Sequence, residues 1–302
     1  MTTSDSFKSG FVTIIGRPNV GKSTLINALM GDKLTITSAK PQTTRNKIQC
    51  ILTTDTSQII LVDTPGIVEK SNSKLGDYMG KAATTAYEGV DIVIMVVEPD
   101  KLIGKMDKAI AKTLRGRKNI LVINKMDTIK PPELLEVMDV FSKLYDFAEI
   151  VPLAAIQGDT YNLTSLIEKH LEPGPMFFPD DMITDQPERQ IAAEMIREKL
   201  LRNLDQEVPH GIGVEILQMK KRKGKNLVDI DATIYCERES HKGMIIGKNG
   251  ELIKKVGQYA RQDIERLIGM KVFLQTKVKV KKDWRNDDLV LKNLGYTKQS
   301  LE

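Results

Sequence analysis

The nine residues from Gly16 to Thr24 have the types and spacing of a loop that binds the phosphates of a nucleotide. They fit the pattern G-x-x-x-x-G-K-[ST], in which glycines let backbone N–H groups approach the phosphates. The lysine of this pattern reaches the β- and γ-phosphates, and the following hydroxyl binds Mg²⁺. We therefore predict that seven residues of this loop contact a nucleotide: Gly16, Asn19, Val20, Gly21, Lys22, Ser23 and Thr24.

The elements on either side of this loop are those that such a motif requires. The apolar run 11–15 predicts a buried parallel strand, and residues 25–30 with Gly31 behind them predict a helix and its end. A helix that begins at the loop directs its partial positive charge at the phosphates.

Two later segments carry candidate ligands for Mg²⁺ and the γ-phosphate. Residues 34–46 show no helical or strand period, so we expect a loop there in which Thr44 binds Mg²⁺ and Thr43 contributes backbone. The buried strand 59–62 runs into Asp63-Thr64-Pro65-Gly66. We predict that Asp63 holds Mg²⁺ through water and that the Gly66 N–H meets the γ-phosphate. The predicted metal set is Ser23, Thr44 and Asp63.

The segment Asn124-Lys125-Met126-Asp127 indicates which base is bound. It follows the second of two apolar strands, 92–97 and 120–123. An aspartate there can accept hydrogen bonds from N1–H and N2–H₂ of guanine, which adenine does not offer. We expect Asp127 to read the base, Lys125 to lie along it, and Asn124 to tie the segment to the phosphate loop. Because this segment is suited to guanine rather than adenine, the alternative of a P-loop ATPase or kinase is disfavoured.

These motifs, in this order, resemble those of translation-factor-type GTPases. The alternation of strands and helices predicts an α/β domain with a mostly parallel sheet and helices on both faces. The resemblance implies that GTP and GDP are bound with Mg²⁺, and that Ala154 and Ala155 back the guanine. Two departures stand out: Ala154 replaces the usual serine, and Ile67 occupies the place of a water-orienting glutamine.

Because of Ile67, we expect hydrolysis to be slow or to be organised by another group. In related GTPases an asparagine at the position of Asn19 helps to coordinate potassium, so K⁺ is a further candidate cofactor. The residues expected to act in hydrolysis are Lys22, Asn19, Thr44 and Gly66.

A proline-rich stretch, 173–188, predicts a linker between a GTPase domain at 1–172 and a second domain at 189–302. The net charge of +5 belongs to the second part, since residues 181–302 hold 24 Lys and Arg against 19 Asp and Glu. Such a surface suits a polyanion.

The second domain has a Gly-Lys-Asn-Gly loop at 247–250 between two predicted helices, and a strand at 271–281 with lysines on one face. The order helix, strand, strand, helix, helix, strand resembles a type II KH domain, α+β in class. There the G-x-x-G loop clamps about four single-stranded nucleotides. The predicted RNA contacts are Lys242, Gly247, Lys248, Asn249, Gly250, Lys277, Lys279 and Lys281.

A GTPase domain followed by a type II KH domain resembles the Era family of bacterial ribosome-assembly GTPases over nearly the whole chain. The resemblance implies binding near the 3′ end of small-subunit ribosomal RNA and assistance in 30S subunit assembly. It also implies a cytoplasmic monomer that can attach peripherally to the inner membrane. The alternative is a nucleotide-gated adaptor for a protein partner or a membrane surface. The most apolar stretch, 90–97, is too short to span a bilayer, and the N-terminus lacks a signal peptide pattern. Cys50 and Cys236 are predicted to be buried reduced thiols.

Overall fold

A computed structural model of the chain describes residues 7–38, 40, 43–65, 73–85, 89–114, 118–158, 160–204 and 208–297. These residues form two compact units. The first comprises Met1–Thr35, Thr44–Ile67 and Gly80–Asp185, and the second comprises Ile36–Thr43, Val68–Met79 and Gln186–Glu302. We call them the nucleotide unit and the KH unit. None of the helices in the described part of the chain is long and apolar enough to cross a membrane.

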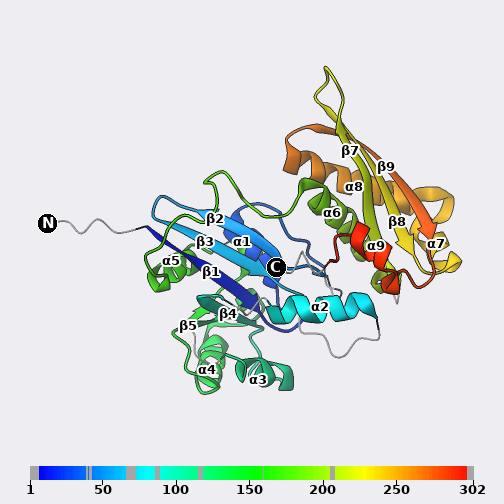
Figure 1. Ribbon diagram of the computed structural model, residues 1–302. Coiled ribbons are helices and arrows are strands. Elements are labelled where there is room, and N and C mark those ends of the chain that lie inside the picture. The colour runs from blue at the N-terminus through cyan, green and yellow to red at the C-terminus, as the bar shows by residue number, and fades with distance from the viewer. Residues whose placement is uncertain are drawn as a thin grey trace. The chain divides into compact units, whose positions relative to one another are not determined.

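The nucleotide unit is built on a six-stranded sheet in the order β2-β3-β1-β4-β5-β6. All neighbouring strands are parallel except the β2–β3 pair, which is antiparallel. The mostly parallel sheet predicted from the sequence is therefore confirmed (Figure 1). The strands are β1 (Lys8–Ile15), β2 (Ile48–Thr53), β3 (Ser57–Asp63), β4 (Ile92–Val97), β5 (Lys118–Ile123) and β6 (Glu149–Pro152).

Helices cover this sheet on both faces, which explains why every residue of β3 and β4 is buried. Apolar residues of β4 and β5 share one core with Ile110 of α3 and with Val137 and Phe141 of α4, whereas α1 and α5 lie against β3 (Figure 1). The helices of this unit are α1 (Lys22–Met30), α3 (Lys105–Ala111), α4 (Pro131–Ser142) and α5 (Tyr161–His170). The residues of α2 (Lys74–Thr85) are divided between the KH unit, as far as Met79, and the nucleotide unit, from Gly80. Of these elements, β2, α2 and α5 were not predicted from the sequence.

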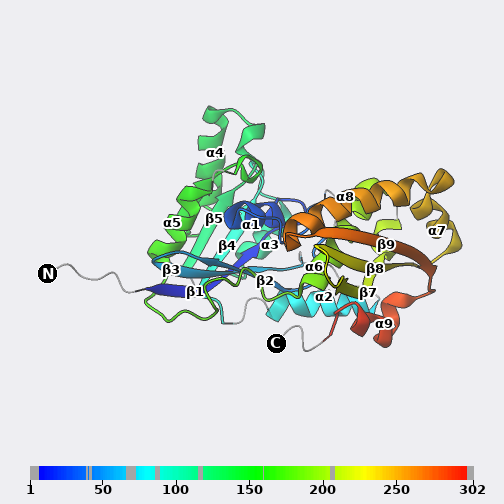
Figure 2. The same cartoon turned by 90° about the horizontal axis from the view of Figure 1, so that it is seen from above.

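The KH unit has a three-stranded sheet in the order β7-β8-β9, with β7 and β8 antiparallel and β8 and β9 parallel. Its helices α6, α7 and α8 share one apolar core with one face of that sheet. The predicted order of helices and strands is thus confirmed, with a short α9 at its end (Figure 2). The elements are α6 (Glu188–Asn203), β7 (Gly213–Lys221), β8 (Leu227–Cys236), α7 (Glu239–Ile246), α8 (Glu251–Ile268), β9 (Lys271–Val280) and α9 (Asp288–Asn293). Cys50 and Cys236 are buried free thiols, as predicted.

Residues 173–185, within the predicted linker, pack against the nucleotide unit. The Phe177 ring lies 5.3 Å from that of Phe11, and a bridge pairs Thr184 with Cys50 of β2. Gln58, fully buried on β3, accepts hydrogen bonds from the Phe177 and Phe178 N–H groups and donates one to the Phe178 carbonyl. The Gln58 side chain therefore supplies three of the hydrogen bonds that hold this segment in place.

Replacing Gln58 with methionine is expected to lower the free energy of unfolding by about 2 kcal/mol, because backbone groups of Phe177 and Phe178 lose their partner. Cleavage by proteases between 173 and 185 should also become faster. Urea unfolding and limited proteolysis of the full chain measure the two effects. Gln49→Met is the matched control, since Gln49 contacts this segment through its backbone N–H and carbonyl. Equal behaviour of both variants would show that Gln58 does not hold the segment.

Candidate functional site

The loop between β1 and α1 has a backbone that only glycine can adopt at two positions. Gly16 has a φ of 151°, and a Cβ there would lie 2.3 Å from the Val96 carbonyl oxygen. Gly21 has a φ of 102°, and a Cβ would lie 2.2 Å from the Asn124 Nδ2 atom. No described side chain caps the start of α1 at Gly21. The first N–H groups of α1 can therefore serve an anion.

Lys22 is buried under this loop. Its Nζ donates to the carbonyl oxygens of Gly16 and Arg17, each at 2.9 Å, so the side chain closes the loop on itself. Burial lowers the pKa of Lys22 to about 8, and the neighbouring Asp63 carboxylate opposes that shift. A buried cation whose hydrogen bonds in the described structure go to neutral carbonyl oxygens is further stabilised when a charged phosphate oxygen comes within reach.

Three oxygen-bearing side chains converge beside Lys22. Ser23 Oγ and Thr44 Oγ1 each donate to Asp63 Oδ2, at 3.1 and 3.2 Å, and lie 3.2 Å from each other. Asp63 is fully buried, and this burial raises its pKa against the opposing effects of Lys22 and of the three hydrogen bonds it accepts. Two hydroxyls and one carboxylate are hard oxygen ligands of the kind that Mg²⁺ prefers, so the cluster fits that ion.

The Asn124 side chain joins the phosphate loop to the segment after β6. Its Nδ2 donates to the Val20 carbonyl at 2.8 Å, and its Oδ1 accepts from the Ala155 N–H at 3.0 Å. The Ala155 N–H, in the pair expected to back the guanine, thus already has Asn124 as a partner. Ala154 is buried.

Lys125 has a left-handed backbone, with a φ of 61°. Its Nζ donates to the Asn19 carbonyl at 2.8 Å and pairs with the Glu98 carboxylate, so the Lys125 side chain lies across the phosphate loop. Asp127 follows on the short helix Met126–Thr128 and is exposed. The described site residues named so far thus gather at the carboxyl ends of β1, β3, β5 and β6. Thr24, half-buried in α1, completes the loop set.

The phosphate loop has a further anchor outside the motifs, and it was not predicted from the sequence. Arg17 Nε donates to Asp107 on α3 at 3.0 Å, and its Nη2 pairs with Asp100 at 3.2 Å. Asp107 is buried, and burial raises its pKa more than Arg17 lowers it. A lone aspartate in a short amphipathic helix carries no sequence signal for this role.

Gly66, predicted to meet the γ-phosphate, and Ile67, which stands in the place of the glutamine, lie outside the described residues. Their placement therefore remains a prediction.

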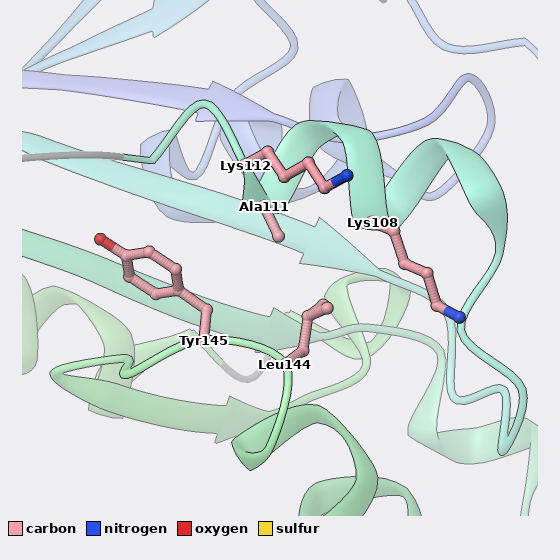
Figure 3. Close-up of a pocket in the computed structure, with 5 residues that line it drawn as sticks. All are labelled: Lys108, Ala111, Lys112, Leu144 and Tyr145. Atoms are coloured by element: carbon pink, nitrogen blue, oxygen red, sulfur yellow. The ribbon is translucent and has the colours of Figure 1, made fainter.

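A shallow depression of about 340 Å³ lies between α3 and the residues that follow α4 (Figure 3). Figure 3 shows Tyr145 and Leu144 on one side of it and Lys108, Ala111 and Lys112 on the other. The Tyr145 hydroxyl accepts from Asn119, the second residue of β5, so the depression lies near the amino end of that strand. None of the predicted site residues lines it.

In the KH unit, the loop 247–250 joins α7 to α8 through one 3-10 turn. Gly247 and Gly250 have φ angles of 74° and 76°, and Asn249 is left-handed at 53°. Lys248 and Asn249 are exposed at this turn, and Lys242 is half-buried on α7. The turn thus presents both predicted side chains to solvent.

The lysines of β9 lie elsewhere in this unit. Val272, Leu274 and Val278 pack in the core with α6, α7 and α8, so Lys277 and Lys279 point to the opposite face of the sheet. Lys281 follows the strand and pairs with Asp287 at 2.8 Å. The predicted RNA contacts therefore fall on two faces, one bearing the glycine turn and one bearing Lys277 and Lys279.

Two family models match the chain, one described as a 50S ribosome-binding GTPase over residues 11–125 and one as a KH domain over residues 207–285. The chain is 53% identical over 294 residues to GTPase Era of Alkaliphilus oremlandii, covering 96% of this chain and 99% of that relative. The chain belongs to the GTPase Era family. GTPase Era of Clostridioides difficile is 52% identical at the same coverage.

Two solved Era structures match over both domains. Era in complex with MgGDPNP and nucleotides 1506–1542 of 16S ribosomal RNA is 38% identical with a TM-score of 0.90, covering 96% of this chain and 99% of that chain. A variant of Aquifex aeolicus Era bound to GDP and AlF4⁻ is 37% identical with a TM-score of 0.90, covering 96% of this chain and all of that one. The GTPase and KH assignments made from the sequence are therefore confirmed.

Proposed function

We propose that the chain is a GTP-hydrolysing switch that binds small-subunit ribosomal RNA near its 3′ end and assists 30S subunit assembly. The observation that carries this is the match of both domains, at a TM-score of 0.90, to Era bound to MgGDPNP and the 1506–1542 segment of 16S RNA. We further propose that it acts as a cytoplasmic monomer able to associate with the inner membrane surface.

The nucleotide would lie on the Gly16–Gly21 loop, with Lys22 at the β- and γ-phosphates and Asp127 at the guanine edge. Ser23, Thr44 and Asp63 would hold Mg²⁺, which neutralises charge on the β- and γ-oxygens when bound. Because Thr44 and Ser23 share Asp63 as partner, the segment containing Thr44 is fixed to the same cluster as the phosphate loop. Gly66 would meet the γ-phosphate.

The test is a titration of the full chain with a single-stranded RNA of the 3′-terminal 16S sequence and with a scrambled RNA of equal composition. GTP hydrolysis is measured with and without each RNA. We expect tighter binding of the 16S sequence and faster hydrolysis in its presence. Equal binding of both RNAs would contradict sequence recognition. Failure to bind either RNA, with co-sedimentation on anionic vesicles, would favour a membrane adaptor instead.

Hydrolysis is expected to be at least about tenfold faster in potassium than in sodium at equal ionic strength. The expectation rests on Ile67 in the place of the glutamine, and on a cation acting where an arginine finger otherwise stabilises charge. Asn19→Gly should remove the difference between the salts. Glycine is the suitable replacement because Asn19 has a φ of 68°, which alanine tolerates poorly. Single-turnover rates in both salts measure the effect, and equal wild-type rates would rule potassium out.

A further inference from the structure

The segment Ile36–Thr43 belongs to the KH unit, although both of its neighbours in the chain belong to the nucleotide unit. On one side, Thr35 is held to α1 because Asn27 Oδ1 accepts from its N–H at 2.9 Å and its hydroxyl donates to the Ser23 carbonyl at 3.1 Å. On the other side, Thr44 hydrogen-bonds to Ser23 and Asp63. The residues that flank the segment in the chain, Thr35 and Thr44, are therefore both hydrogen-bonded to Ser23.

Within the KH unit, α6 holds every polar group of Thr37. The Thr37 N–H and hydroxyl donate to Glu198 Oε1 at 3.0 and 3.2 Å. Arg202 donates to the Thr37 carbonyl at 3.1 Å, to its hydroxyl at 2.7 Å, and to Glu198 at 2.9 Å. Arg197 also donates to the Thr43 carbonyl. We call Glu198 and Arg202 the α6 latch.

The same network continues to the helix that follows the glycine turn. Glu198 Oε2 accepts from Lys199 at 2.9 Å, and Lys199 pairs with Asp263 of α8 at 2.5 Å. Arg197 and Glu198 are fully buried, and Lys199 is 8% exposed. A chain of charged contacts thus joins Thr37 to α8, whose first residue, Glu251, directly follows Gly250.

The latch can open without stranding a buried charge. If Thr37 leaves, Glu198 retains Arg202 and Lys199, and Arg197 retains Glu194 at 2.8 Å. Removing one partner of a buried pair is what costs most, and here no pair is broken. Such a contact suits a segment that binds to α6 and is released again. In a permanently buried core, apolar residues would stabilise the fold equally well.

A second segment also packs in the KH unit, but more weakly. Lys74 pairs with Asp288 at 2.6 Å with both side chains more than half exposed, and the Tyr78 ring lies 5.6 Å from that of Tyr296. Exposed ion pairs contribute little. The contact of Thr37 with the buried Glu198 of α6 is therefore expected to be the stronger of the two.

We propose that Glu198 and Arg202 are positioning residues that hold the 36–43 segment, and through it Thr44, so that the nucleotide state and RNA affinity depend on each other. This rests on the proposed function. By linkage, a nucleotide that favours one placement of the segment changes RNA affinity by the same factor by which RNA changes nucleotide affinity.

The experiment measures the dissociation constant of the 3′-terminal 16S RNA in the presence of GDP and of a non-hydrolysable GTP analogue, for the full chain. The ratio of the two constants is expected to lie between about 5 and 150 in the wild type, the usual range of such coupling. In Arg202→Met it should fall to about one, and Thr37→Val should lower it less. Arg202 is 47% exposed, so the variant is expected to fold, and thermal melting checks this.

The matched control is Arg222→Met. Arg222 is 42% exposed and pairs with Asp229 at 2.6 Å in the same unit, without a recorded contact to the segment. Its ratio should equal that of the wild type. RNA binding with the same ratio in wild type and Arg202→Met would overturn the latch alone. A wild type that does not bind RNA would overturn the proposed function, and the latch with it.

Discussion

Asp127→Asn is expected to weaken GTP binding at least tenfold and to strengthen binding of xanthosine triphosphate. The aspartate would accept hydrogen bonds from N1–H and N2–H₂ of guanine. In the asparagine variant the side-chain NH₂ group, itself a donor, would face one of these two donors. A hydrogen bond to a charged group contributes about 1.5–3 kcal/mol, and 1.4 kcal/mol corresponds to a factor of ten in affinity. Asp127 is exposed, so its replacement should not disturb the core.

Competition between GTP and xanthosine triphosphate for a fluorescent nucleotide measures both changes. Asp139→Asn makes the same chemical change on α4, where the exposed Asp139 carboxylate pairs with the exposed Lys143, and it should leave both affinities unaltered. Unchanged GTP affinity in Asp127→Asn would remove guanine recognition from this segment.

Changing both Lys248 and Asn249 to aspartate is expected to weaken single-stranded RNA binding by about tenfold to a hundredfold. Each repulsive pair with a nearby phosphate costs on the order of 1 kcal/mol after screening, and the loop becomes more negative by three charges. Asn249 is left-handed, a conformation that aspartate also tolerates, so the turn should keep its shape. The salt dependence of binding should fall by about one counterion.

RNA titrations at several salt concentrations measure this effect, with thermal melting as a check on folding. Lys223→Asp with Asn226→Asp is the control, because it changes the charge by the same amount at the exposed turn between β7 and β8. Equal weakening by both double variants would mean that overall charge, rather than the glycine turn, governs binding.

The sequence alone predicted the strand, loop and helix around Gly16–Thr24, and it predicted the order of elements in the KH unit as far as β9. These features depend on residues close together in the chain. The motif identifies Gly16 and Gly21 by spacing alone, and their positive φ angles agree with glycine there, whereas the contacts with Val96 and Asn124 that exclude a side chain come from the tertiary fold. The β4 strand was predicted at its exact bounds because a continuous apolar run between polar residues suits a strand buried on both faces.

Other elements depend on partners distant in the chain. The edge strand β2 is defined by antiparallel pairing with β3 and by residues 183–185, rather than by a pattern of its own. Likewise, alternation along β9 predicted which lysines share a face. Only packing against α6, α7 and α8 decided that Lys277 and Lys279 lie on the opposite face of the sheet from those helices.

The run Arg197-Glu198-Lys199 is the clearest example of residues whose burial could not be predicted from the sequence. In sequence it has the composition of a solvated helix surface, yet Arg197 and Glu198 are fully buried. Their charges are balanced on α6 itself by Glu194, Lys199 and Arg202. Segments more than 60 residues away then add hydrogen bonds from Thr37 to Glu198 and from Arg197 to the Thr43 carbonyl, and an ion pair between Lys199 and Asp263. A buried charge is stable only when its partners are in place, and the tertiary fold supplies those that α6 itself does not.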